Sequence, residues 1–298
     1  MENKQLNIDV ALVLSLVAIQ FPKWKDLPIR PVIPGGWDNR TFHLGENMLV
    51  RMPSAAGYAA QVEKEHQWLP RLAPHLPLSI PVPLEMGNPG KGYPWKWSIY
   101  RWLEGDTVAS TPIDNLSEFA VSLAQFLVAL QKTDTTGGPL PGLHSFYRGG
   151  SLSVYDADTR RAIDQLEGKI DVEVALNIWE TALATSWNHP LVWVHGDISV
   201  GNLLAEGGRL CAVIDFGQLT VGDPACDLVM TWTLFQGKSR EAFRKVLPLD
   251  AGTWARARGW ALWKALVTAA GFTNPNNAES KQCWRIIDEV LADHKRSV

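Results

Sequence analysis

Residues 191–217 constrain the fold of this 298-residue chain more than any other segment: LVWVHGDISVGNLLAEGGRLCAVIDFG. A short apolar strand enters a loop that carries Asp197 and Asn202, and two more apolar strands follow around a Glu-Gly-Gly turn. Such a hairpin brings its two ends together, so Asn202 and Asp215 are expected to point into the same space. The segment therefore predicts one polar site made of three side chains that lie apart in the sequence.

These residue types at this spacing indicate a particular chemistry. Carboxylate and amide oxygens, with phosphate oxygens, are the ligands that Mg²⁺ prefers. We expect Asn202 and Asp215 to hold Mg²⁺, while Asp197 stands free of the metal and accepts a proton from a hydroxyl. A base, then an Asn ligand, then Asp-Phe-Gly is the order found in phosphoryl transfer from ATP. The alternative is a purely structural hairpin in which Asp215 is only a turn residue.

The order of secondary structure along the chain predicts the fold class. Residues 31–53 are typical of two short strands around a turn at LGEN, after a Gly-rich corner. A helix over 56–73 ends before the prolines of IPVP, and a strand follows at 95–105. Strands first and helices afterwards predict an α+β, two-lobed protein rather than a doubly wound sheet. We place the two lobes at residues 1–104 and 105–298.

The second lobe begins with a helix that has a recognisable start. Asn115 and Glu118 form a capping arrangement before a stripe of apolar residues. Near the end of the chain, a Trp-rich helix is expected from Thr253 to Gly271. Thr253 is predicted to cap its start and Gly271 its end.

The apolar segment 10–21 is expected to be an amphipathic helix, because it is too short to cross a bilayer. Its inward face is predicted to hold Val10, Leu14, Val17 and Phe21. No basic region precedes it and no small-residue cleavage site follows, so the segment does not indicate a signal peptide. Three cysteines without a CxxC pair fit a reducing cytoplasm. The net charge of −3 does not indicate the strongly basic composition that is typical of nucleic-acid-binding proteins.

At WVHGDISVGNLL…AVIDFGQLTVGDPACDL the chain resembles the aminoglycoside phosphotransferase family, whose members are relatives of the protein kinases. The resemblance implies a two-lobed, protein-kinase-like fold with ATP between the lobes. It implies that Asp197 is the catalytic Asp and that Asn202 and Asp215 are the Mg²⁺ ligands. It further implies that Asp227 braces the catalytic loop, and we expect His195 to orient that loop by hydrogen bonds.

A kinase-like chain needs a basic residue that holds the nucleotide phosphates and is paired to a helix Glu. Arg51, in MLVRMP, stands where protein kinases have that lysine, and its planar fork can bind phosphate. Glu63 and Glu65 are both candidates for its partner. Only Glu65 falls on the apolar stripe of the 56–73 helix, where an unpaired carboxylate would be costly. The stripe consists of Tyr58, Val62, Leu69 and Leu72. We therefore expect an Arg51–Glu65 pair.

Two further segments of the first lobe are expected to contact the nucleotide. In GGWDNR, Gly35 and Gly36 allow close approach of the backbone to phosphate, and Asn39 can bond a phosphate oxygen. By the resemblance, YRWLEG links the lobes, with the Arg101 carbonyl and the Leu103 amide at the adenine edge.

The acceptor is expected to be a hydroxylated small molecule. A cationic one, such as an aminoglycoside, would suit residues 105–298, whose net charge is −5. Four tryptophans either line a flatter, more apolar acceptor site or belong to the core: Trp232, Trp254, Trp260 and Trp263. Relatives with this motif set also phosphorylate macrolides, choline, homoserine and sugars, and fold resemblance does not choose among them.

The leading hypothesis is therefore an enzyme that transfers the γ-phosphate of ATP, or of GTP, to a small-molecule hydroxyl with the help of Mg²⁺. Neither a nucleic acid nor a membrane is expected as a partner. A nucleotide-binding pseudokinase scaffold is the alternative from another class, which the intact Asp197, Asn202 and Asp215 disfavour. A protein kinase is disfavoured because about a dozen residues separate Asp215 from Asp227, which leaves no room for a peptide-docking loop.

Overall fold

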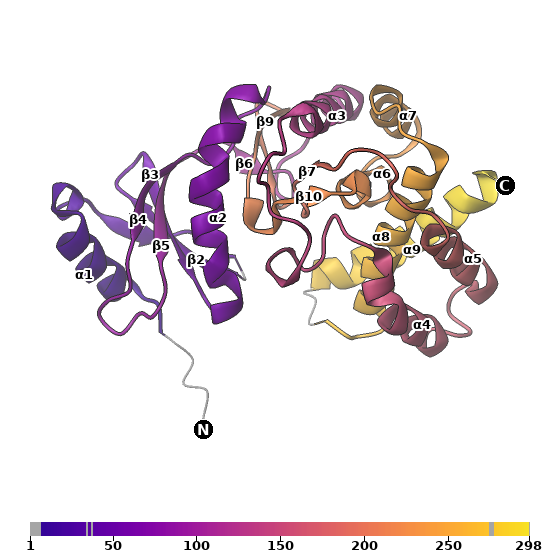
Figure 1. The fold of residues 1–298 in the computed structure, drawn as a ribbon, viewed down its shortest axis with the longest axis horizontal. Coiled ribbons are helices and arrows are strands. Elements are labelled where there is room, and N and C mark those ends of the chain that lie inside the picture. Colours follow the sequence, from indigo (N-terminus) through magenta and orange to yellow (C-terminus); the bar gives the residue numbers. More distant parts are fainter. Residues whose placement is uncertain (1–6, 34, 37, 274–276, 298) are drawn as a thin grey trace.

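The computed structural model describes residues 7–33, 35–36, 38–273 and 277–297. Figure 1 shows a β-rich N-terminal part on one side and a larger, mainly helical C-terminal part on the other, with α2 between them. The predicted α+β, two-lobed architecture is thus confirmed. The helices are α1 (Val10–Gln20), α2 (Ala56–Leu72), α3 (Leu116–Lys132), α4 (Asp156–Gln165), α5 (Val172–Leu183), α6 (Met230–Thr233), α7 (Gly237–Val246), α8 (Ala251–Ala269) and α9 (Asn277–Ser297).

The N-terminal part is built on an antiparallel sheet with the strand order β1-β2-β3-β5-β4. Its strands are β1 (Ile29–Pro31), β2 (Asn39–Leu44), β3 (Met48–Pro53), β4 (Pro83–Gly87) and β5 (Trp97–Arg101). The β2–β3 pair forms the predicted hairpin, with Leu44 opposite Met48 across the turn. The strand expected at 95–105 is shorter, because pairing with β3 and β4 extends only to Arg101.

The alternation of side chains along β3 and β5 assigns the two faces of this sheet. Val50 and Ile99 are fully buried in an apolar cluster with α1. Arg51 and Tyr100, one residue further along each strand, face α2, where both reach Glu65. One face of the sheet is therefore apolar core, and the other presents a cation and a phenol to the inter-lobe side.

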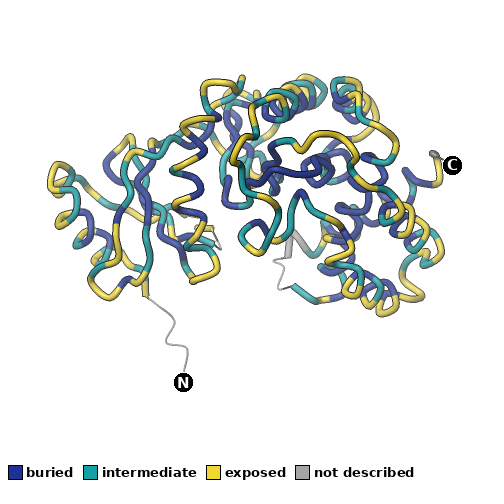
Figure 2. Tube along the Cα trace, in the orientation of Figure 1, coloured by how far each residue is buried: buried dark blue, intermediate teal, exposed yellow. Residues whose placement is uncertain are grey.

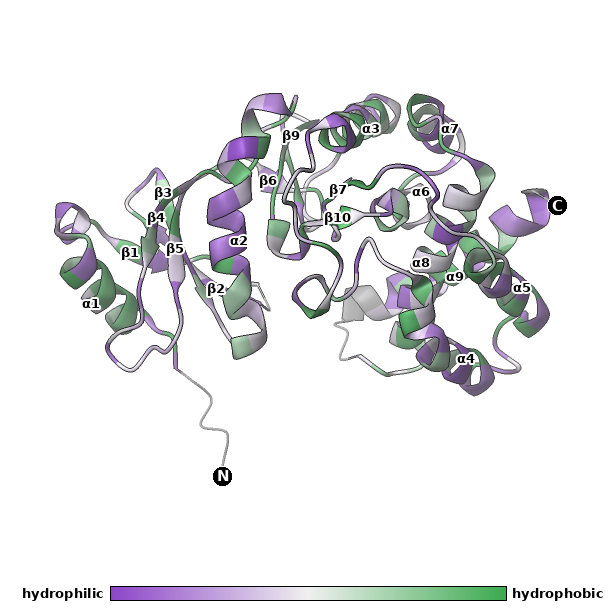
Figure 3. Cartoon of the chain, viewed as in Figure 1, coloured by the Kyte–Doolittle hydropathy of each residue, from purple (hydrophilic) through white to green (hydrophobic). Residues whose placement is uncertain are grey.

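The predicted inward face of α1 is only partly right, since Val17 is buried and Val10 and Phe21 pack against the core, but Leu14 does not. Val13, Leu16 and Val17 are buried, whereas Leu14 is 39% exposed. The reason lies in the composition of the helix, which is apolar nearly all round (Figure 3), so that its periodicity could not select a face. Packing of α1 against the sheet determined which of its side chains are buried.

The C-terminal part surrounds α8, which is buried along most of its length (Figure 2). Two small antiparallel sheets lie beside the helices, β7–β10 and β6–β8–β9. Their strands are β6 (Asp106–Thr107), β7 (Val192–Val194), β8 (Leu203–Glu206), β9 (Arg209–Val213) and β10 (Thr220–Gly222). The β8–β9 hairpin is the one predicted from residues 202–217.

The helix ends test the predicted caps. At the start of α3, the Asn115 side chain accepts the backbone N–H of Glu118 at 3.2 Å, as expected. At the start of α8 the prediction is wrong, because Asp250 caps the helix and accepts both the N–H and the hydroxyl of Thr253. Two cap-forming residues three positions apart competed, and the carboxylate satisfies more donors. Gly271 follows the end of α8 with a φ of +77°, as a left-handed terminator does.

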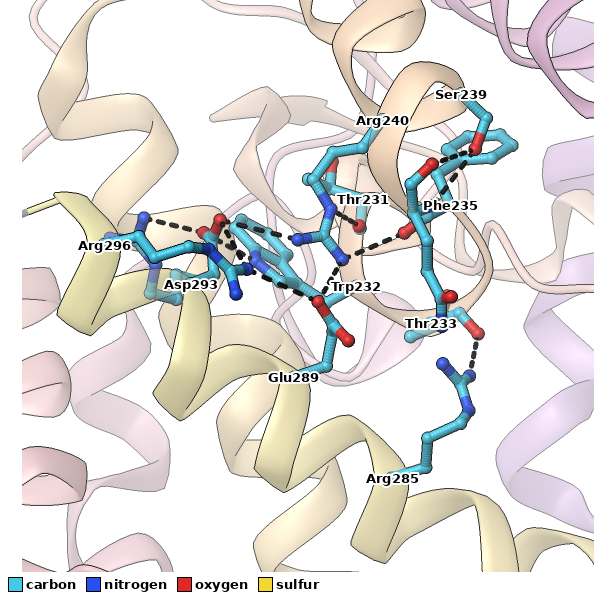
Figure 4. Close-up of polar contacts among 12 residues, drawn as sticks. Thr231, Trp232, Thr233, Phe235, Ser239, Arg240, Arg285, Glu289, Asp293 and Arg296 are labelled. Carbon is cyan, nitrogen blue, oxygen red and sulfur yellow. Dashed lines mark hydrogen bonds and ion pairs between the residues drawn. The ribbon is translucent and has the colours of Figure 1, made fainter.

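A buried charge network ties the C-terminal helices together (Figure 4). The Asp293 carboxylate accepts hydrogen bonds from Trp232 Nε1 at 2.9 Å and from Arg258 at 3.0 Å. Arg240 lies 3.5 Å from Asp293 and 2.8 Å from Glu289. These residues come from α6, α7, α8 and α9, so one carboxylate connects four helices. Within the described ranges, every helix is too short or too polar to traverse a bilayer.

Candidate active site

The hairpin brings Asn202 beside Asp215, as its spacing predicted. The Asn202 carbonyl accepts the backbone N–H of Ile214, the residue before Asp215, at 2.9 Å. The Asn202 side-chain nitrogen donates to the carbonyl of Asp197 at 2.9 Å and to its carboxylate at 3.0 Å. The nitrogen is thereby committed to Asp197, which leaves Oδ1 of Asn202 as the atom suited to a metal ion.

Asp215 occupies a strained position at the start of the Asp-Phe-Gly segment. Its φ is +63°, in the left-handed region that Asp tolerates better than most residues. Its carboxylate accepts a 2.7 Å bond from Nη2 of Arg51. Desolvation raises the pKa of Asp215, but the charge and hydrogen bond of Arg51 outweigh it and hold the pKa below its ordinary value. Asp215 is therefore ionised in its resting state.

The carboxylates of Asp197 and Asp215 lie close enough for their negative charges to interact. Desolvation, and after it the negative charge of Asp215, raise the pKa of Asp197. The Asp215 carboxylate and the Asn202 amide oxygen are donors that suit a hard divalent cation, and a cation bound to them would also offset the repulsion between Asp215 and Asp197. The described residues hold no cluster of three or more His, Cys, Asp or Glu side chains. A metal ion here would thus depend on Asn202, Asp215 and phosphate oxygens, as Mg²⁺ commonly does with nucleotides.

His195 and Asp227 hold the loop that carries Asp197. The Asp227 carboxylate accepts the backbone N–H groups of His195 at 2.7 Å and Gly196 at 2.8 Å. The His195 ring links the Ile214 carbonyl, 3.0 Å from Nε2, to the backbone N–H of Asp197, which donates to Nδ1 at 3.1 Å. Burial lowers the pKa of His195 to about 4, so its ring is neutral at pH 7. Both residues orient the loop and neither faces the open side of the site.

The Arg51–Glu65 pair forms as predicted. Nη1 of Arg51 lies 3.2 Å and 3.3 Å from the two carboxylate oxygens of Glu65. The hydroxyl of Tyr100 donates to the same carboxylate. Because Nη2 of Arg51 bonds Asp215, one guanidinium joins α2 to the Asp-Phe-Gly segment. The predicted nucleotide clamp and the predicted metal ligand are therefore in direct contact.

The remaining predicted nucleotide contacts lie in or next to strands β2 and β5 of the N-terminal sheet. Gly36 is exposed, and its carbonyl accepts a 3.0 Å bond from Arg40. Asn39 is 7% exposed at the start of β2. Arg101 ends β5, and Leu103 lies in the segment that leads into the C-terminal part. Their contacts with a nucleotide stay predictions.

Lys64 is a site residue that sequence reasoning missed. Its buried ammonium donates to the carbonyl of Gly217 at 2.7 Å and lies 3.1 Å from Nδ1 of His144. Burial lowers the pKa of Lys64 to about 8. An added Cβ at Gly217 would lie 2.7 Å from the Gln61 side chain, so a larger residue there would require the Gln61 amide to shift. The missed signal was a second inward stripe on α2, made of Gln61, Lys64 and Trp68, whose first two members are polar.

A cavity of about 650 Å³ is lined in part by the loop that carries Asp197. Its wall includes Asp197, Arg148, Lys264, Trp260 and Trp263. Of the four tryptophans considered from the sequence, two therefore line a cavity next to the catalytic loop. All four tryptophans are buried in the core, and Trp232 and Trp254 do not line this cavity.

The fold and this constellation together define a two-lobed, kinase-like protein. A model of the phosphotransferase enzyme family matches residues 30–260, and the chain belongs to that family. The resemblance drawn from the sequence motifs is thereby confirmed. A search of curated proteins found no match.

Several solved structures share the fold. The GDP and kanamycin complex of APH(2″)-IIIa has a TM-score of 0.70 at 18% identity and covers 96% of this chain and 99% of its own. The streptomycin–ATP complex of APH(2″)-IIa has a TM-score of 0.60 at 18% identity. The match covers 96% of the present chain and 97% of the APH(2″)-IIa chain. The macrolide 2′-phosphotransferase MphH from Brachybacterium faecium has a TM-score of 0.58 at 19% identity, with 94% and 98% covered.

Proposed function

We propose that this protein transfers the γ-phosphate of ATP, or of GTP, to a hydroxyl of a small-molecule acceptor. The observation that carries this proposal is that Asp197 lines the 650 Å³ cavity and also lies close enough to Asp215, the partner of Arg51, for the two carboxylates to interact. Residues 1–104 would clamp the nucleotide, and residues 105–298 would hold the acceptor. The similar structures include complexes with GDP and with ATP, which supports this assignment.

Each group has a distinct part in the proposed reaction. Arg51, held by Glu65, would bind the phosphates of the nucleotide. Oδ1 of Asn202 and the carboxylate of Asp215 would hold Mg²⁺, which supplies charge neutralisation at the phosphates when bound. Asp197, with its pKa raised by desolvation, would accept the hydrogen bond and then the proton of the acceptor hydroxyl. Transfer would be direct, without a covalent enzyme intermediate.

The experiment combines a product search with one substitution. Purified protein, ATP and Mg²⁺ are incubated with aminoglycosides, macrolides and small hydroxylated metabolites, and phosphorylated products are detected by mass. Asp197→Asn should lower the turnover about 10²-fold or more while nucleotide binding persists, because only the proton acceptor is removed. Asp164→Asn, an exposed carboxylate on α4, is the matched control. Full activity in Asp197→Asn would exclude the assigned role, and nucleotide binding without any product would favour a pseudokinase scaffold.

A further inference from the structure

Arg148 takes no part in the proposed phosphoryl transfer, but its side chain lines the cavity together with Asp197. Its Nε donates to the side-chain oxygen of Gln218 at 3.2 Å. Its guanidinium carbon lies 4.9 Å and 4.8 Å from the ring centres of Trp260 and Trp263. Within the described part of the chain, the two Nη groups have no hydrogen-bond partner, so a fixed guanidinium presents unused donors next to the catalytic loop.

The backbone that delivers Arg148 is strained. Phe146 and Tyr147, the two residues before it, have φ values of +46° and +55°. The left-handed region disfavours both side chains, and such strain gathers at functional sites. The turn is fixed by backbone bonds, among them Arg148 N–H to the Ser145 carbonyl at 2.9 Å. The fold therefore keeps an unfavourable conformation at the residues that place this guanidinium.

The charges around the cavity favour one class of ligand. Arg148 and Lys264 both line it, and both lower the pKa of Asp197 by their charge. Among the lining residues that the structure describes, Asp197 is the one acidic side chain. A polycation entering here would meet two positive groups and one carboxylate. An oxyanion would meet a planar guanidinium whose geometry matches carboxylate and phosphate.

We propose that the acceptor carries, besides its hydroxyl, a carboxylate or phosphate group that binds Arg148, and an apolar body that packs on Trp260 and Trp263. This inference rests on the proposed function and narrows the chemical class of its acceptor. The anionic group would anchor on Nη1 and Nη2 of Arg148, with Lys264 adding attraction at the same wall. The hydroxyl would then face Asp197. The acceptor of this protein is accordingly not an aminoglycoside-like polycation.

The test uses ligands that differ only in charge. Mandelate, mandelamide and 2-amino-1-phenylethanol share a ring and a benzylic hydroxyl but are anionic, neutral and cationic. A wider set of hydroxylated aromatic compounds, each as acid, amide and amine, accompanies them. Binding is measured by tryptophan fluorescence with Mg·ADP present, and phosphorylation by mass. We expect acids to bind at least tenfold more tightly than their amides, and amines to bind least.

Substitutions at the two cations complete the test. Arg148→Gln should remove the preference for acids over amides, Arg148→Lys should keep part of it, and Lys264→Gln, on an exposed side chain, should reduce it. Arg209→Gln, at an exposed position of β9, should change nothing. The proposal is overturned if amides or amines bind as tightly as acids, if no acid binds, or if Arg148→Gln slows all acceptors equally. Absence of nucleotide binding would instead count against the proposed function itself.

Discussion

At the scale of single residues, Arg51 is the group on which most of the proposed site converges. Nη1 pairs with Glu65 and Nη2 with Asp215, so two nitrogens of one rigid plane serve two carboxylates. An ammonium group is a point charge and cannot keep both contacts in this geometry. Desolvation alone would lower the pKa of Arg51, but the charges of Asp215 and Glu65 raise it by more. The guanidinium therefore stays positively charged at any working pH.

We therefore predict that Arg51→Lys will raise the KM for the nucleotide about tenfold, the cost of one lost charge-assisted contact of about 1.4 kcal/mol. The melting temperature should change little by comparison, because the substitution keeps a positive charge. Nucleotide titrations and steady-state kinetics measure the effect. Arg30→Lys, at an exposed position of β1, is the control. An unchanged KM would show that Arg51 serves the structure and not the nucleotide.

The pH dependence of turnover is a second prediction at this scale. Asp197 must be deprotonated to accept a proton, and desolvation and Asp215 raise its pKa. Turnover should therefore fall as the pH is lowered, with an inflection above the ordinary Asp value of about 3.9. Lys264 lowers the pKa of Asp197, so Lys264→Gln should move the inflection of kcat/KM to higher pH. An inflection that stays in place or moves down would contradict this account of Asp197.

At the scale of secondary-structure elements, the Asp293 network is the strongest test of how the C-terminal helices are held. Asp293 accepts bonds from Trp232 and Arg258 and also pairs with Arg240. Asp293→Ala would remove one carboxylate shared by two buried cations, of which Arg240 keeps its contact with Glu289. We predict a loss of about 3–5 kcal/mol in the free energy of unfolding, measured with urea. Asp288→Ala, an exposed carboxylate on the same helix, should cost little, and equal effects of the two would refute the prediction.

Elements differ in how far their sequences determine them. The β8–β9 hairpin and the Asn115 cap were predictable, because turn chemistry and capping are local and act within a few residues. The inward face of α1 was predictable only in part, since an almost wholly apolar helix offers little contrast between its sides. The start of α8 was missed because Asp250 and Thr253 are both suitable caps, and only the folded geometry shows which one accepts.

The same difference between local and long-range contacts separates the site residues that could be predicted from those that could not. Asp197, Asn202 and Asp215 could be predicted, because they lie around one hairpin whose pairing fixes their proximity. Glu65 could be predicted because a charged residue on an apolar stripe requires a partner. Arg148 and Lys64 could not, because their contacts are made with elements distant in the sequence, and a lone cation in a loop or helix carries no periodic signal.

At the scale of the whole molecule, α2 belongs to both lobes. Glu65 faces the N-terminal sheet, whereas Trp68 packs on Trp193 of β7 with 4.8 Å between ring centres. Figure 1 shows α2 between the sheet and the remaining helices. Lys64 adds a polar contact across the same boundary, to Gly217 in the Asp-Phe-Gly segment. The two lobes are thus joined by a helix whose successive side chains face opposite partners.

The charge state of Lys64 should make this junction depend on pH. Burial lowers its pKa to about 8 in the folded protein from 10.5 in the unfolded chain. Between these two values the unfolded chain binds more protons, so the stability due to Lys64 rises with pH over this window and is lost as the pH falls through about 8. Lys64→Met removes the titrating group. We predict that the difference in unfolding free energy between the wild type and Lys64→Met will increase from pH 7 to pH 10, in favour of the wild type.

Urea unfolding at a series of pH values measures that difference directly. Titrating groups that lie far from Lys64 contribute equally to both proteins and cancel, whereas Lys64 contributes to the wild type alone. Lys132→Met, at an exposed position of α3, should give a difference that does not vary with pH. A difference that is flat or falls for Lys64→Met would mean that the ammonium is stabilised in the fold as well as in water. Lys64 would then be a permanent ionic contact between the lobes, and the junction would not respond to pH.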